Sequence, residues 1–305
     1  MQTTINETVS FDGVGLHTGV PVRMTLRPAP AGFGIAFRRV DLGGQPRIPA
    51  VWDAVVPGAL CTKIAAPSGA SVSTIEHIMA AAAGCGVHNL TIDIDGPEVP
   101  VMDGSSAVFV AEILRVGLRA LDAPIRAIEV LDRVEVRNGD AMARLDPCDH
   151  LEMAFHIDFA DAAIGRQDKT MSLANGAFVH ELCDSRTFCR AADIDAMRAQ
   201  GLALGGSLEN AVVVKGAEVL SPGGLRHHDE AVRHKMLDAL GDLALAGAPL
   251  LAHYTGVRAG HAMTNALLRA LFARPNACRI VTASPALAAR LPGAGLSRDD
   301  APRVV

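Results

Sequence analysis

The sequence predicts an α+β fold built from two halves of similar topology. Its 305 residues are enough for about two domains with sizeable cores. Each half closes with the same order of segments: an alanine-rich helix stopped by glycine, a short strand, a loop and a second helix. This internal pseudo-repeat places the two alanine-rich helices at equivalent positions, so their side chains meet if the halves pack face to face.

The first half, residues 1–122, is expected to be strand-rich around two helices. Its start alternates apolar and polar residues on either side of the glycine-rich loop 13–19. The last glycine of that loop falls one residue late for a dinucleotide fingerprint and strand-like sequence follows it, so we expect a hairpin turn. The later segments are expected to be short strands over 32–64, a helix over about 74–83, a strand over 90–94 and a helix over about 107–118.

The second half, residues 126–285, follows a candidate linker at 122–124. The polar run 165–170 is expected to separate its early strands from a later one. The expected elements are strands over 128–136, 141–145 and 151–159, a short helix near 193–200, a strand over 211–214, the central helix over about 229–246, a strand over 250–254 and a helix over about 262–272. The tail, residues 286–305, is rich in Ala, Pro, Gly and charge, and we expect it to be flexible.

Charge and composition argue against several classes of function. The 28 Lys and Arg residues against 33 Asp and Glu residues leave a net charge of -5 and no overall basic field for nucleic acid. The N-terminus lacks a secretory signal and no run of about 18 apolar residues appears, so we expect a cytoplasmic protein without an integral membrane segment. The six cysteines form no C-x-x-C pair and are interpreted as reduced thiols.

The central helix carries a row of three polar residues. His234, Asp238 and Asp242 are each four residues apart, so they stack on one side of a helix. Such a row is usually a solvated face, and that alternative stays open for this helix alone. Apolar residues flank the row on both sides, however, and buried carboxylates need a cation, a metal or several donors.

Glu76 and His77 lie at the start of the equivalent helix in the first half. Each also has a structural interpretation, because Glu76 has capping-box spacing from Ser73 and His77 could be a packed core histidine. With His234 and Asp238, however, His77 completes the His-His-carboxylate set of a catalytic zinc site whose fourth position is left to water. We expect the metal to lower the pKa of that water to about 7 and Glu76 to act as general base.

Other residues are candidates for the remaining steps of a hydrolysis. The leaving group needs a proton, and His261, at a loop-to-helix junction, is the candidate acid. Asp242 could hold that imidazole and favour its protonated form. Thr187 and Lys235 could stabilise a developing oxyanion together with the metal.

At these residues the chain closely resembles the UDP-3-O-acyl-N-acetylglucosamine deacetylases, zinc amidases of lipid A biosynthesis. The resemblance covers about residues 2–285. It is carried by the segments 13–19 (GVGLHTG), 73–77 (STIEH), 100–105 (PVMDGS), 186–188 (RTF), 206–211 (GSLENA), 233–242 (RHKMLDALGD) and 260–261 (GH).

The resemblance implies roles for individual residues. It implies a small-molecule substrate, an acylated UDP-amino sugar, whose N-acetyl group is hydrolysed to acetate and a free amine. The implied metal, zinc or else ferrous iron, is bound by His77, His234 and Asp238. Glu76 is implied as the base and His261 as the acid or electrostatic partner. Asp242 supports His261, and Thr187 lies near the oxyanion. The substrate contacts expected are Phe188, Lys235, Leu60 and Cys61, with His17 near the site where excess metal can inhibit.

The resemblance also implies an architecture. Two-layer α/β sandwich domains of like topology, 1–122 and 126–285, would each carry an insert and form the site at their interface. The second insert, about 189–215, would form an apolar passage for the 3-O-acyl chain. Departures from the usual family pattern affect the shape of that passage and its acyl-length preference rather than any proposed ligand; they are Cys189, His227, Ala231 and Ala259.

Two other function classes fit less well. A serine hydrolase is disfavoured because the chain has no Gly-x-Ser-x-Gly elbow. A purely structural metal clamp between the halves is disfavoured because structural zinc usually has four protein ligands, often cysteines, and no cysteine lies beside these ligands. We expect the protein to be a monomer.

Overall fold

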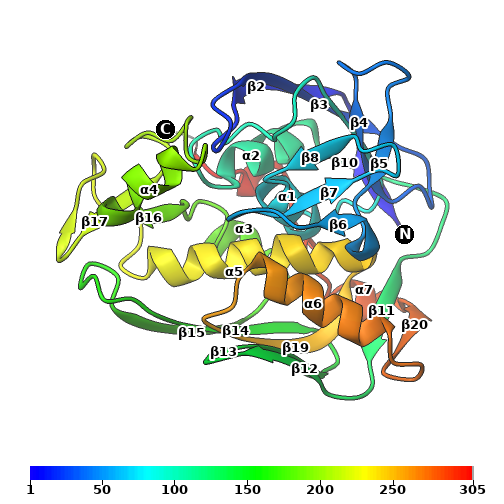
Figure 1. The fold of residues 1–305 in the computed structure, drawn as a ribbon. Coiled ribbons are helices and arrows are strands. Elements are labelled where there is room, and N and C mark those ends of the chain that lie inside the picture. The colour runs from blue at the N-terminus through cyan, green and yellow to red at the C-terminus, as the bar shows by residue number, and fades with distance from the viewer. Residues whose placement is uncertain (304–305) are drawn as a thin grey trace.

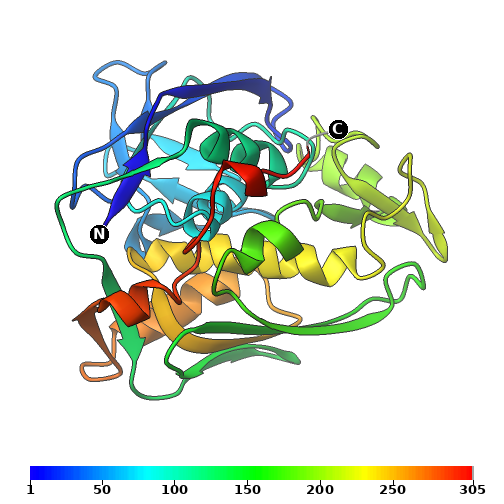
Figure 2. The same cartoon turned by 180° about the vertical axis from the view of Figure 1, so that it is seen from behind.

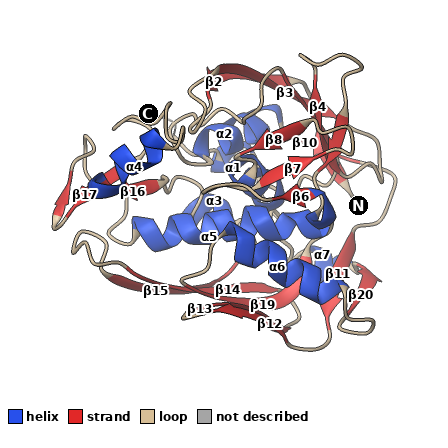
Figure 3. Cartoon of the chain, in the orientation of Figure 1, coloured by secondary structure: helices blue, strands red, loops and turns tan. Residues whose placement is uncertain are grey.

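The structure is a computed structural model that describes residues 1–303, and it is an α+β fold with separate sheets. In Figure 1 a sheet at the top, a layer with α1 (Glu76–Gly84) and α2 (Ala107–Val116), a layer with α5 (Glu230–Leu243) and α6 (His261–Phe272), and a second sheet at the bottom follow one another. Figure 3 shows α1, α2, α5 and α6 between the strands of the two sheets. One large apolar core runs from the first sheet through the helices to the second.

The first half forms a five-stranded sheet against α1 and α2. The burial of β3 alternates, with Val22, Met24 and Leu26 turned inward as expected for a half-buried strand. The glycine-rich loop is a hairpin turn, as predicted, because Val14 pairs with Pro21 across it. The strand order is β2 (Val9–Val14), β3 (Pro21–Pro28), β9 (Leu90–Ile94), β4 (Ile35–Arg39) and β5 (Arg47–Pro49).

Smaller elements complete the first half and lead the chain into α1. The antiparallel pair β1 (Thr3–Ile5) and β10 (Leu118–Ala120) joins the two ends of this half. The strands before α1 form a sheet of their own, preceded by a 3-10 turn; these elements are η1 (Trp52–Ala54), β6 (Val55–Val56), β7 (Lys63–Ala65) and β8 (Ser71–Ser73). The predicted helix over 74–83 begins two residues late, at Glu76, because Thr74 lies in the left-handed region with φ of 57°.

The second half forms a seven-stranded sheet on the other side of α5 and α6. Its strands are β11 (Arg126–Val130), β12 (Val134–Asn138), β13 (Ala141–Pro147), β14 (Leu151–Asp158), β15 (Arg166–Ser172), β19 (Leu250–Val257) and β20 (Cys278–Thr282). The predicted central helix corresponds to α5 with the 3-10 turn η3 (Ala244–Ala246), and α3 (Ala177–Glu181) packs against α1.

Two strand predictions in this half were wrong. The stretch 128–136 is not one strand, since β11 pairs with β19 and β20 whereas β12 pairs with β13. The polar run 165–170 is not a separator but most of β15, which pairs with β14 alone. As an edge strand it alternates exposed and half-buried residues without a buried one, so its sequence carries no apolar alternation.

A separate three-stranded sheet projects at the left of Figure 1. This part of the chain contains the short helix predicted near 193–200 and the strand predicted over 211–214. Its elements are β16 (Phe188–Arg190), η2 (Ala191–Asp193), α4 (Ile194–Ala199), β17 (Val212–Lys215) and β18 (Glu218–Val219).

The tail runs back along the molecule behind α1 and α2, as Figure 2 shows. It contains α7 (Pro285–Ala288) and η4 (Arg298–Asp300), and the side chain of Leu291 is buried against Ile125, Ala127 and Leu251. Its flexibility in solution, like the domain boundaries, stays a prediction. Within residues 1–303, no helix has the length and apolar character that crossing a membrane requires.

Candidate metal and active site

Three metal-ligating side chains meet where α1 packs against α5. His77 comes from α1, and His234 and Asp238 come from successive turns of α5. The Nε2 atoms of His77 and His234 lie 3.7 and 3.3 Å from Asp238 Oδ1, and the possible ligand atoms of all three residues lie within 4.8 Å of one another. All three side chains are buried, as is that of Asp242, so the solvated-face alternative for the α5 row is wrong.

The protonation states of these donors suit a divalent cation. Burial lowers the pKa of His77 to about 3 and also lowers the pKa of His234, so both rings are neutral at pH 7. Burial alone would raise the pKa of Asp238, but His234 and Lys235 hold it below its usual range. His234 Nδ1 donates to Ser185 O at 3.0 Å, which turns Nε2 toward Asp238 in the way that metal-binding histidines are usually oriented.

Glu76 lies beside this donor set and does not cap α1. No side chain caps that helix, so the capping-box alternative is wrong. Its Oε2 instead accepts a hydrogen bond from Thr62 N at 3.1 Å, and its Oε1 lies 3.7 Å from His261 Nε2. Burial raises the pKa of Glu76 to about 7, with Asp242 and Asp238 adding to the rise and His261 opposing it. The carboxyl group can therefore exchange a proton near neutral pH.

His261 is held by Asp242, the third residue of the α5 row. Its Nδ1 lies 2.9 Å from Asp242 Oδ2, and Asp242 Oδ1 accepts a bond from Thr62 Oγ1 at 2.5 Å. Burial would lower the pKa of His261, but the charges of Asp242 and Glu76 and the bond to Asp242 together raise it to about 9. The imidazole is thus protonated at neutral pH, with Nε2 4.0 Å from Asp238 Oδ2.

Among the residues predicted to contact the oxyanion or the substrate, Lys235 and Phe188 lie beside the donor set. Lys235 Nζ donates to Asp238 Oδ2 at 3.0 Å, and although burial would lower its pKa, Asp238 raises it, so the residue is a cation. The Phe188 ring lies 6.3 Å from the His234 ring. Thr187, the preceding residue, is fixed by its backbone, which donates to Gly104 O and accepts from Val212 N.

Leu60, Cys61 and His17 are the other residues that the sequence analysis expects at the site. The Leu60 side chain is 60% exposed and its φ is 60°, so an apolar group projects from a strained loop. Burial, with the charge of Glu76, raises the pKa of the Cys61 thiol to about 12, which keeps it protonated. His17 is buried, and its Nδ1 accepts a bond from Ala203 N at 3.4 Å.

Two supporting residues were missed by the sequence reasoning. Thr62 holds both Glu76 and Asp242. Glu98 is buried and accepts from the backbone N–H groups of His17 and Thr18 and from the hydroxyls of Thr18 and Thr74. It fixes the glycine-rich turn and the strained residue before α1. The only feature of the sequence that pointed to Glu98 was its position between two prolines in the loop 96–106.

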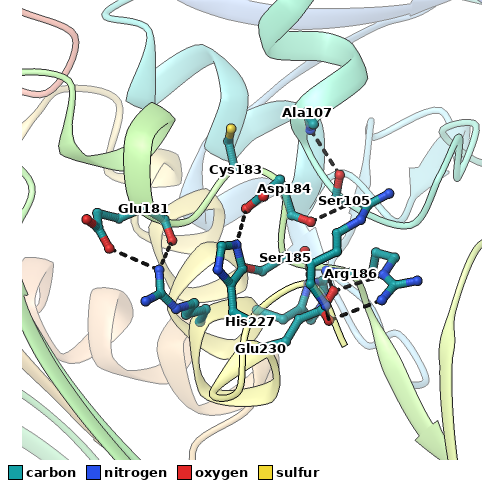
Figure 4. Close-up of polar contacts among 12 residues, drawn as sticks. Ser105, Ala107, Glu181, Cys183, Asp184, Ser185, Arg186, His227 and Glu230 are labelled. Carbon is teal, nitrogen blue, oxygen red and sulfur yellow. Dashed lines mark hydrogen bonds and ion pairs between the residues drawn. The ribbon is translucent and has the colours of Figure 1, made fainter. Parts of the chain in front are cut away.

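A polar network supports the segment that carries Ser185 (Figure 4). Arg186 N and Nε donate to Glu230 Oε1, near the start of α5, at 3.0 and 2.9 Å. His227 Nε2 lies 2.8 Å from Asp184 Oδ1, and Arg226 Nη1 donates to Asp103 Oδ2 at 2.9 Å. These bonds fix the carbonyl that orients His234, and the Arg226 bond joins the second half to the first.

The site contains two neutral imidazoles, a carboxylate and a second carboxyl group that titrates near neutrality. A metal-dependent hydrolase uses these groups. Residues 2–273 match the family model LpxC, UDP-3-O-acyl N-acetylglycosamine deacetylase. The chain therefore belongs to this deacetylase family.

Individual relatives agree with the family match over nearly the full chain. The chain is 48% identical over 288 residues to the UDP-3-O-acyl-N-acetylglucosamine deacetylase of Phenylobacterium zucineum (strain HLK1), covering 94% of this chain and 98% of that protein. It is 46% identical over 280 residues to that of Anaeromyxobacter sp. (strain Fw109-5), covering 92% of this chain and 91% of that protein. To the enzyme of the same name from Myxococcus xanthus (strain DK1622) it is 43% identical over 295 residues, which cover 97% of this chain and 93% of that protein.

Proposed function

We propose that the protein hydrolyses the N-acetyl group of UDP-3-O-(3-hydroxyacyl)-N-acetylglucosamine to acetate and a free amine, the committed step of lipid A biosynthesis. Membership of the deacetylase family supports the substrate class. The observation that carries the chemistry is the buried donor set of His77, His234 and Asp238 with Glu76 and His261 beside it.

The donor set fits one zinc ion, with ferrous iron as the other metal that the family implies. His77, His234 and Asp238 would hold it in the protonation states already described. When bound, the metal supplies Lewis acidity that polarises the amide carbonyl and lowers the pKa of a water molecule. Its identity is part of the proposal.

Glu76 and His261 move the protons. Glu76 takes a proton from the attacking water through Oε1, because its Oε2 is occupied by the Thr62 N–H group. His261 is protonated at neutral pH and gives its Nε2 proton to the leaving amine, while Asp242 fixes the ring through Nδ1. Glu76 Oε1 and His261 Nε2 lie 3.7 Å apart, so both groups can reach the same scissile bond.

The remaining predicted residues bind the substrate in this proposal. Lys235 and Thr187 stabilise the oxyanion, and Phe188, Leu60 and Cys61 contact the substrate. The insert, about 189–215, forms the acyl passage; its exposed Leu204 and Leu208 support an apolar role. The packing of α1 on α5 supports a site at the interface of two domains, 1–122 and 126–285, of repeated topology.

The test is acetate release from the acylated UDP-amino sugar by purified protein, before and after metal removal with a chelator. We expect release to be lost on chelation and restored by about one equivalent of zinc. Two acyl lengths separate a selective passage from an inactive site. If folded, zinc-loaded protein releases acetate from neither substrate, the proposal is wrong. The monomeric state and the cytoplasmic location stay predictions.

A further inference from the structure

A second group of metal-ligating side chains lies on the outer face of the second sheet. Cys148, His150 and Glu152 occur at every second position from the turn after β13 into β14, and their ligand atoms all lie within 4.8 Å of one another. All three side chains are half-buried. The neighbours Leu151 and Met153 face the core, so the sheet separates this group from the catalytic centre.

The spacing of these donors is that of ligands on one ion. Cys148 Sγ lies 3.6 Å from His150 Nδ1. With bond lengths of about 2.3 Å to sulfur and about 2.0 Å to nitrogen, two ligands at the tetrahedral angle are about 3.5 Å apart. Glu152 pairs across the sheet with His253, whose Nδ1 lies 3.5 Å from Glu152 Oε2. A ligand carboxylate is commonly held by such an outer partner.

The nearby arginine neutralises a different acid. Arg290 forms a bidentate bond to Asp149, with both distances 2.9 Å, and its Nη2 lies 3.2 Å from His150 Nδ1, which is itself 2.8 Å from Asp149 Oδ1. Among residues 1–303, Glu152 has no lysine or arginine in an ion pair. The nearby cation is thus paired with Asp149, and a metal ion bound at His150 would replace the contacts that its Nδ1 makes with Asp149 and Arg290.

We propose that Cys148, His150 and Glu152 form a second metal site that binds a thiophilic divalent transition ion of the zinc class. A thiolate with an imidazole and a carboxylate favours Zn²⁺ or Co²⁺ over Mg²⁺ or Ca²⁺. The thiol gives up its proton on binding, water completes the coordination, and His253 holds the carboxylate. The ion fixes the β13–β14 turn to the start of β14. The site does not depend on the proposed deacetylase activity.

Cobalt titration of reduced, metal-free, full-length protein tests this site. A thiolate bound to Co²⁺ gives a near-ultraviolet charge-transfer band, and the catalytic donors include no sulfur, so the band reports the second site alone. We expect Cys148→Ser to abolish the band and to lower bound cobalt from about two equivalents to about one, with acetate release kept. Cys278→Ser, which alters another half-buried thiol of the same half, is the matched control and should change neither.

Two further variants test the other members of the site. Glu152→Gln keeps the thiol and should weaken cobalt binding at this site about tenfold. Arg290→Gln removes a positive charge close to His150 and should tighten it about fivefold, a response not expected of an isolated reactive thiol. The proposal is overturned if the wild type shows no band, if the band survives in Cys148→Ser, or if Glu152→Gln binds cobalt as the wild type does.

Discussion

Glu76 is a buried carboxyl group whose two oxygens have different surroundings, one bonded to the Thr62 N–H group and one facing His261. Glu76→Gln preserves the acceptor for Thr62 but cannot take a proton. We expect kcat to fall by about 10²- to 10⁴-fold, the usual contribution of a general base. Metal analysis of the same variant should show unchanged zinc, since Glu76 is not among the proposed ligands. Wild-type turnover would remove Glu76 from the mechanism.

The pH dependence follows from the same pair of residues. Because the pKa of Glu76 is about 7 and that of His261 is about 9, kcat/KM should fall as the pH drops through about 7 and as it rises through about 9. The charge of Asp242 is the largest cause that raises the pKa of His261. Asp242→Asn should therefore move the alkaline limb to lower pH. An unmoved alkaline limb in kcat/KM against pH would contradict the assignment of that limb to His261.

The same pKa shift affects stability, with a defined sign. His261 has a pKa that is raised on folding, so its contribution to stability is complete below pH 6.5 and is lost as the pH rises through about 9. In Asp242→Asn this alkaline loss should be smaller. Urea unfolding of the wild type and the variant at several pH values measures the difference, and equal losses in both would show that Asp242 is not the cause.

Individual residues differ in how far the sequence could predict them. His234, Asp238 and Asp242 were predictable because helical spacing alone places them in one row. Thr62 and Glu98 were not, since each acts on residues distant in the chain: Thr62 bonds Asp242 across 180 positions and Glu98 bonds His17 across 81. Polar residues that support a site have no local pattern, and only the packed fold shows which groups they reach.

At the scale of elements, the contact between α1 and α5 is close because Gly241 has no side chain. A Cβ atom at Gly241 would lie 2.0 Å from the carbonyl oxygen of Glu76, which is backbone and cannot rotate away. Helix propensity alone predicts that Gly241→Ala stabilises the protein by about 1 kcal/mol. We expect instead a loss of about 2 kcal/mol or more, because α1 must move away from α5, with a parallel loss of kcat/KM.

Urea unfolding and kcat/KM of the Gly241 variant check this packing. Gly43→Ala is the matched control, since nothing lies within 4 Å of a Cβ atom there. Its effect should be within about 0.5 kcal/mol. A stabilised Gly241→Ala would show that the two helices do not pack as closely as described.

Elements with an apolar face were predicted well, and those without one were not. The helices α1, α2, α5 and α6 and the strand β9 lie close to their expected ranges, because each buries apolar side chains in a regular pattern. The strand β15 was missed because it is held by backbone pairing to β14 rather than by burial. Backbone pairing leaves little trace in side-chain composition.

At the scale of the whole molecule, the site is shared between segments far apart in the chain. His77 precedes the linker expected at 122–124, whereas His234 and Asp238 follow it. Protein bonds also join the two sides, including Thr62 to Asp242 and Arg226 to Asp103. A metal ion held by all three ligands would add a further link between α1 and α5. The repeated topology itself stays a prediction from the order of segments.

That link predicts a dependence of stability on metal. An ion that binds the folded protein alone stabilises it by RT ln(1 + [L]/Kd), about 2.7 kcal/mol at a free concentration of 100 Kd. Thermal unfolding should therefore show a higher midpoint with zinc than with chelator. Measuring this in Cys148→Ser isolates the catalytic site from the second site proposed above. Adding His77→Gln should abolish the zinc-dependent increment, because α1 then supplies no ligand; an increment that persists would mean that the ion does not join the two helices.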